Sequence, residues 1–189
     1  MFKQLLQSFI WGLLGLVAAL LTSCASSEQA PVNQSIWTYQ PDAITVSYSA
    51  PAKLNMQNDQ PHVLLLAVVQ TADLQSIQSY LQNSQGISLL LEKSNDPGQT
   101  QSFYITKIFV NPGDSHQVKV TRMAGMQHVV VVAGYNHLYT DQVVKIFNIP
   151  VDSKSAGLAF WHRIHYPAAI DISVALGEQG IDKAYYVKN

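Results

Sequence analysis

The chain has 189 residues, one cysteine, and 11 basic against 12 acidic side chains, which gives a formal charge of −1. This balance lacks the clustered Lys and Arg of nucleic-acid-binding proteins, and one cysteine can form neither an intramolecular disulfide nor a cysteine-rich zinc site. The hydrophobic fraction of 48% excludes a disordered chain and, at this length, favours one globular domain.

The N-terminus has the pattern of a secretory signal peptide. Lys3 is the one charged residue before Glu28, and residues 9–21 (FIWGLLGLVAALL) are all apolar or glycine. This run is shorter than the roughly 20 residues of a spanning helix and fits the hydrophobic region of a signal peptide. An uncleaved membrane anchor is the alternative that its length disfavours.

Leu21-Thr22-Ser23-Cys24 follows at the end of this run and resembles the lipobox of bacterial lipoproteins. The resemblance implies cleavage before Cys24, a diacylglycerol on its thiol, and an acyl chain such as palmitate on its freed amine. Two or three chains anchor a protein far more firmly than one. Ala25, in place of an aspartate that favours the inner membrane, implies the outer membrane, facing the periplasm. The alternative is an incidental cysteine beside an ordinary signal peptide.

The composition then divides the chain into three parts. We expect a lipoprotein signal peptide over 1–23, the lipidated cysteine and a tether over 24–42, and a β-sandwich domain over 43–189. Small, polar residues and prolines over the tether are typical of a linker. Trp37 and Tyr39 interrupt that composition, and either begin the fold or lie at the membrane interface.

From Ala43 on, hydrophobic residues alternate, which predicts a strand with Ile44, Val46 and Tyr48 on one face. A polar loop follows, and then the run VLLLAVV over 63–69 predicts a strand that is covered on both faces. Residues 72–82 predict a short amphipathic helix, with Thr71 or Asp73 as its N-cap. Residues 87–91 fit either a helix or a strand.

The sequence pattern predicts further strands in the second half of the chain. Residues 102–110 predict a strand with Phe103, Ile105 and Phe109 on one face, and 111–114 predict a tight turn into a hairpin partner over 117–122. Further strands are expected over 128–135, 143–150, 170–176 and 184–187. The chain is therefore predicted to be mainly β, a two-sheet sandwich of seven or eight strands with one short inserted helical element.

The sequence contains no pattern that favours catalysis. His162 and His165 are three apart, so on a strand they would point to opposite faces, which is unsuited to joint metal ligation. On a helix they would share a face, but Pro167 argues against a helix there. Gly113-Asp114-Ser115 resembles the nucleophile segment of an esterase family, but the Asp-x-x-His that such enzymes need does not follow, so a turn is favoured. We expect no enzyme activity, no cofactor beyond the acyl chains, no metal, no nucleic acid and no small-molecule substrate.

Three segments carry a resemblance to a known family: Leu54-Asn55 before the apolar strand, Asn111-Pro112-Gly113 before an alternating strand, and VVAGY over 131–135. Their order, behind the lipobox, resembles TssJ, the outer-membrane lipoprotein family of the type VI secretion system. The resemblance implies a transthyretin-like sandwich. It also implies that the chain binds the periplasmic region of the inner-membrane protein TssM and anchors a trans-envelope complex.

The family further implies that the loop between the first two strands contacts the partner. In this chain that loop includes Lys53, Leu54, Asn55, Met56, Gln57, Asn58 and Asp59. Leu54 and Met56 are apolar in a polar loop, which suits an adaptable contact surface, although Leu54 could instead fold back onto the core. A second candidate surface is Tyr135–Tyr139, where a core-edge tyrosine is the alternative.

The chain departs from the family pattern at Asn55-Met56, where Asn-Pro is common, and lacks an arginine near Tyr135. Two other functions therefore stay open. One is an assembly or pilotin lipoprotein of another secretion apparatus, and the other is a periplasmic hydrolase that uses Ser115 or a histidine.

Overall fold

The computed structural model describes residues 36–96, 101–155 and 163–187. Within them the strands are β1 (Gln40–Ser49), β2 (Leu64–Thr71), β3 (Phe103–Val110), β4 (Ser115–Arg122), β5 (His128–Gly134), β6 (Val144–Asn148), β7 (Val151–Ser155), β8 (Arg163–Pro167), β9 (Ile170–Leu176) and β10 (Ile181–Tyr186). The helices are α2 (Gln75–Leu81), α3 (Ser84–Glu92) and α4 (Thr140–Val143). Cys24 and His162 lie outside the described residues.

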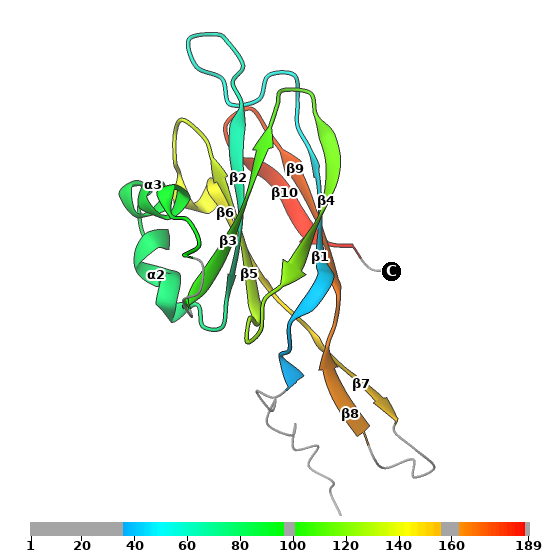
Figure 1. The fold of residues 1–189 in the computed structure, drawn as a ribbon. Helices are drawn as coiled ribbons and strands as arrows, with labels where there is room; N and C mark the ends of the chain where they lie inside the picture. Colours follow the sequence, from blue (N-terminus) through cyan, green and yellow to red (C-terminus); the bar gives the residue numbers. More distant parts are fainter. Residues whose placement is uncertain (1–35, 97–100, 156–162, 188–189) are drawn as a thin grey trace, which may run out of the picture. The chain divides into compact units, whose positions relative to one another are not determined.

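Two four-stranded sheets form a sandwich, as the alternating pattern predicted (Figure 1). One sheet has the order β10-β9-β1-β4, and the other has the order β3-β2-β5-β6. The pairs are antiparallel except for β1 and β9, which run in parallel. The inward-facing side chains of both sheets, among them Ile44 and Ile172 from one and Leu66 from the other, make one core.

The central strands β2 and β5 are buried almost throughout because both of their faces are covered. One face meets the opposite sheet, and α2 and α3 lie over the other (Figure 1). Helices on one side and a sheet on the other explain the unbroken apolar runs of these strands.

The inserted helical element consists of two helices rather than one. Residues 87–91 belong to α3, whose N-cap Asn83 accepts a hydrogen bond from the Gly86 amide at 2.8 Å. Before α2, the Asp73 side chain accepts from the Gln75 amide at 2.9 Å. Since β2 and β3 are antiparallel neighbours, the two helices are an insertion between them and not a parallel crossover.

The predicted hairpin of residues 102–110 with 117–122 is wrong, because β3 and β4 lie in different sheets. The tight turn exists, with Gly113 at φ +82°, but the Gly113 amide donates to the Pro51 carbonyl at 3.0 Å. The chain therefore passes from one sheet to the other at this turn, and β4 continues antiparallel to β1. Alternation gives the face of each strand and not its partner, so the sequence favoured the nearest one.

The face of β3 that carries Phe103, Ile105 and Phe109 is only partly covered. Ile105 is buried, whereas Phe109 is 70% exposed. The opposite face of β3, with Ile108 and Val110, contributes to the core.

The sandwich includes residues ahead of Ala43. Trp37 is buried in the core, and the guanidinium carbon of Arg122 lies 5.8 Å from the centre of its ring. Tyr39, by contrast, is exposed. Trp37 therefore belongs to the fold. Within the described residues, no helix has the length and hydrophobicity needed to cross a membrane.

Candidate functional site

The loop between β1 and β2, drawn in cyan at the top of Figure 1, contains backbone hydrogen bonds of its own. Gln57 and Gln60 exchange backbone hydrogen bonds of 2.9 and 3.0 Å. Between them, Asn58 and Asp59 have φ of 51° and 60°, the left-handed values that a type I′ turn requires at both central positions. The tip of the loop is therefore a small hairpin, held by its own backbone.

Asn55 fixes the base of this loop. Its backbone has φ of 49°, which asparagine tolerates better than most residues. Its side chain donates to the Val63 carbonyl at 3.2 Å and accepts from the Asn136 amide at 2.8 Å. The loop is thereby tied both to the approach to β2 and to the segment that follows β5.

The seven predicted contact residues divide into two groups. Leu54 is fully buried and Asn55 is 9% exposed. Leu54 therefore folds back onto the core, which was the alternative to a contact surface. Lys53, Gln57, Asn58 and Asp59 are exposed, and Met56 is half-buried. These five are the loop residues that a partner could touch, and contact by them stays a prediction.

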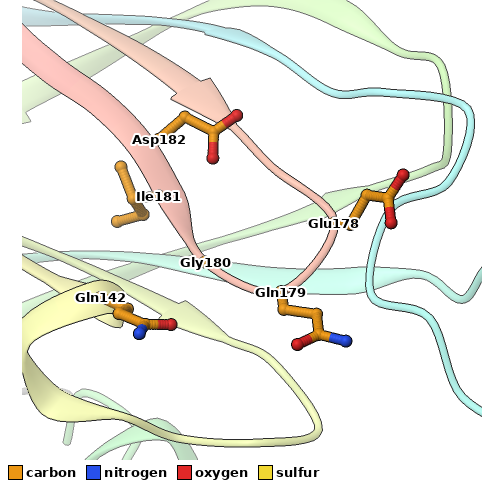
Figure 2. A pocket seen from close by; sticks show the side chains of 6 residues that line it. All are labelled: Gln142, Glu178, Gln179, Gly180, Ile181 and Asp182. Carbon is orange, nitrogen blue, oxygen red and sulfur yellow. The ribbon is translucent and has the colours of Figure 1, made fainter.

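The turn between β9 and β10 lies beside the loop, where the Met56 amide donates to the Glu178 carbonyl at 3.4 Å. Figure 2 shows this turn with the side chains that line an open, mainly polar pocket of about 460 Å³: Gln142, Glu178, Gln179, Gly180, Ile181 and Asp182. The Glu178 side chain extends toward the loop in Figure 2. The candidate surface thus includes acidic groups that follow the loop by some 120 residues in the sequence. Gly177 and Gly180 are a sequence signal for a turn, but nothing in the sequence places that turn beside the loop between β1 and β2.

Tyr135 connects the same region from inside the protein. It is 3% exposed, and its hydroxyl is within hydrogen-bond distance of two carbonyl oxygens, 3.0 Å from that of Gly177 and 2.8 Å from that of Gly180. Burial raises the pKa of Tyr135 well above its usual range, and the nearby carboxylate of Asp182 adds to this rise. Tyr135 is therefore a core-edge residue rather than part of a contact surface.

The rest of the second candidate surface lies against the start of α3. Asn136, His137, Leu138 and Tyr139 line a shallow pocket of about 420 Å³ together with Ser84, Gln85 and Ser88. Asn136, His137 and Tyr139 are exposed. Their polar and aromatic side chains suit a contact at the edge of an interface.

The other singled-out residues lie apart from this region. In the turn before β4, the Asp114 side chain accepts from the Asn111 amide and side chain, and the Ser115 hydroxyl donates to the Tyr48 carbonyl. His165 is exposed on β8. Among the described residues, no three His, Cys, Asp or Glu side chains are close enough together to hold a metal ion.

Comparisons with known proteins connect this arrangement to one fold. No family model matches the chain, and no curated protein matches its sequence. Among solved structures, it is similar to the type VI secretion lipoprotein TssJ1 from Pseudomonas aeruginosa, with a TM-score of 0.53 and 14% identity over 80% of this chain and 98% of that one. It is also similar to a chain described as belonging to a type VI membrane complex, with a TM-score of 0.50 and 11% identity over 79% of this chain and 98% of the other. The chain thus has the two-sheet fold of the lipoprotein TssJ1, as the resemblance in its motifs predicted.

Proposed function

We propose that this chain is a non-enzymatic outer-membrane lipoprotein that anchors the trans-envelope complex of a type VI secretion system. In this proposal, acyl chains on Cys24 hold it on the periplasmic face of the outer membrane. The domain binds the periplasmic region of a TssM-like inner-membrane protein.

The observation that carries the proposal is the constrained loop after β1, on a domain with the TssJ1 fold. A loop whose backbone is set by its turn and by Asn55 loses little conformational entropy when a partner binds it. Met56 offers a flexible apolar contact there, and Asp59 offers a charge at the tip. The lipobox at Cys24 supports the membrane anchor independently of the loop.

The anchor is tested by Cys24→Ser in the full chain. We expect the variant to lose outer-membrane fractionation and secretion, because no thiol remains for the diacylglycerol. Labelled palmitate should enter the wild-type protein and not the variant. Outer-membrane fractionation of Cys24→Ser at the wild-type level would contradict the anchoring mechanism.

The loop is tested by Met56→Asp and Asp59→Lys. The measurement is binding to the periplasmic region of a TssM-like protein, whose gene the proposal expects near the gene of this chain. Each change should raise the Kd at least about fivefold, since one central interface side chain often contributes 1 kcal/mol or more. The melting temperature of each variant is measured alongside, because Met56 is half-buried and lysine tolerates the φ of 60° at position 59 less well than aspartate. A small fall is expected, and each variant should stay folded at the temperature of the binding measurement.

Asp96→Lys is the matched control, since it makes the same charge change at an exposed position outside the loop. It should bind like the wild type. Unchanged affinity in both loop variants would place the interface elsewhere. The absence of contractile-sheath and TssM-like genes near this one would favour a lipoprotein of another secretion apparatus.

A further inference from the structure

The hairpin of β7 and β8 leaves the sandwich (Figure 1) and, within the described chain, pairs with no other strand. Its five residue pairs run from Val151 with Pro167 to Ser155 with Arg163. A two-stranded hairpin is at best marginally stable in water by itself, because it has no second layer to cover it. An additional contact would therefore stabilise this one.

The exposed side chains of the hairpin combine apolar and cationic groups. Ile164 is 46% exposed and Tyr166 is 39% exposed, and they lie on the same face because they are two apart on β8. Lys154, opposite Ile164, places its ammonium 5.5 Å from the centre of the Tyr166 ring. Arg163 and His165 are exposed on the other face, and Asp152 is the one acidic side chain of the two strands.

The base of the hairpin is fixed to the first described residues by a buried arginine. Arg122 is 1% exposed, and its guanidinium donates to the carbonyls of Pro167 and Ala168 at 3.4 Å each. The same group donates to the Thr38 carbonyl at 3.4 Å and to the Gln40 side chain at 2.8 Å. The hairpin therefore begins where the chain enters the sandwich.

This position places the hairpin within reach of the proposed lipid. Ile36, the first described residue, is twelve residues after Cys24, and a fully extended segment of that length spans at most about 40 Å. Figure 1 shows β7 and β8 at the end where β1 begins, and the loop after β1 at the other end. With the lipid on Cys24 as proposed, the bilayer lies within about 40 Å of Ile36, which is at the end of the sandwich that carries the hairpin.

We propose that the β7–β8 hairpin is a second membrane contact, which lies against the lipid surface that holds the acyl chains. Ile164 and Tyr166 pack at the boundary between headgroups and acyl chains, where an apolar or aromatic side chain with a polar neighbour is favoured. Lys154, on the same face, lies beside lipid phosphates, to which cations near an anionic membrane are attracted. This inference rests on the proposed function for the position of the lipid. Residues 156–162, outside the described chain, are not part of the proposed surface.

The test uses the single cysteine of the chain to reproduce the tether. A protein of residues 24–189 keeps the whole buried core, which lies between Trp37 and Ile181. It is coupled through Cys24 to a maleimide lipid in vesicles of phosphatidylethanolamine and phosphatidylglycerol. Hydrogen exchange of the β7 and β8 amides is then compared with the same protein free in solution, its thiol blocked. We expect exchange on the vesicles to slow by about fivefold to tenfold, as the half-exposed side chains become buried.

Ile164→Glu should remove this slowing. The vesicle-coupled variant is compared with the same variant free in solution, which corrects for any change in hairpin stability. Ile146→Glu is the matched control, since Ile146 is 49% exposed on β6 and should leave the slowing intact. Equal exchange on and off the vesicles in the wild type would overturn the proposal, and so would slowing that persists in Ile164→Glu. The vesicle test uses chemical coupling and so does not depend on natural acylation of Cys24. Natural acylation is tested separately, by the mass of the protein purified from membranes, and its absence would contradict the proposed function.

Discussion

At the scale of single residues, Asn55 does the most to shape the candidate surface. Its side chain satisfies the Val63 carbonyl and the Asn136 amide, and its backbone has a left-handed conformation. The two roles are separable, because glycine keeps the second and loses the first. Asn55 therefore explains how a polar loop keeps one conformation above a buried leucine.

We predict that Asn55→Ala lowers the free energy of unfolding by about 2–4 kcal/mol, through two lost hydrogen bonds and the left-handed strain of alanine. Asn55→Gly should lose about 1–2 kcal/mol less, because glycine adopts this φ without strain. Urea unfolding of both variants measures the difference. If alanine and glycine were equally destabilising, the left-handed backbone would not contribute to loop stability.

Tyr135 gives the fold a dependence on alkaline pH. Its pKa is raised in the folded protein, mainly by burial, so the stability it contributes is complete below the unfolded pKa of about 10 and is lost as the pH rises above it. We predict that Tyr135→Phe removes up to about 1.4 kcal/mol per pH unit from the slope of stability against pH in that window.

The measurement is urea unfolding of both proteins at several pH values from neutral to strongly alkaline. Burial also raises the pKa of Tyr48 and Tyr186, and both proteins share those contributions. The comparison therefore isolates Tyr135. Parallel curves for the two proteins would show that Tyr135 ionises in the folded state as readily as in the unfolded state.

At the scale of elements, the contact between α2 and α3 depends on a glycine. A Cβ built on Gly86 would lie 2.6 Å from the Tyr80 carbonyl oxygen and 2.8 Å from that of Ser79, closer than such atoms can approach. Glycine to alanine within a helix normally adds about 1 kcal/mol of stability. Here the backbone of α2 leaves no room for it.

We therefore predict that Gly86→Ala destabilises the protein by about 1–3 kcal/mol, the usual cost of overpacking. Hydrogen exchange should accelerate first in α2, whose backbone must move. Ser88→Ala is the control, since Ser88 is exposed on the same helix. A stabilised Gly86→Ala would mean that the helices separate without loss, and that this contact does not hold the insertion on the sheet.

The sequence predicted well those strands in which burial is either continuous or alternates from one residue to the next. β2 and β5 have unbroken apolar runs because both of their faces are buried. β9 has one buried face, so its apolar residues alternate: Ile170, Ile172, Val174 and Leu176. Residues 87–91 stayed open because a short apolar run fits a helix or a strand, and the Asn83 cap decides the matter locally.

Such patterns did not show which strands pair or which loops lie beside one another. The partner of β4 is β1, which precedes it by about 70 residues, and no local signal names it. The acidic turn at Glu178 joins the candidate site for the same reason, through contacts between distant segments. The β7–β8 hairpin went unpredicted because its residues face solvent and have little apolar alternation.

At the scale of the sandwich, its two ends have different contacts. β1 runs for ten residues, about 33 Å, from the base of the hairpin to the loop that carries Met56. The parallel and antiparallel pairing of β1 with β9 and β4 makes that path a continuous part of one sheet. In the two proposals above, the sandwich is a spacer between the proposed membrane contact at one end and the proposed partner-binding loop at the other.

We predict that changes at the two ends act independently. Met56→Asp should weaken partner binding and leave the vesicle-dependent slowing of hydrogen exchange in the hairpin unchanged, and Ile164→Glu should do the reverse. The double variant should show both losses at their single-variant size, within about 0.5 kcal/mol, because sites this far apart rarely couple. Partner affinity is measured with the protein coupled to vesicles through Cys24, and again with it free. Vesicle coupling could raise partner affinity by more than the change in local concentration requires. In that case the two ends would be coupled energetically through the sheet, and binding at the membrane end would change the affinity of the loop.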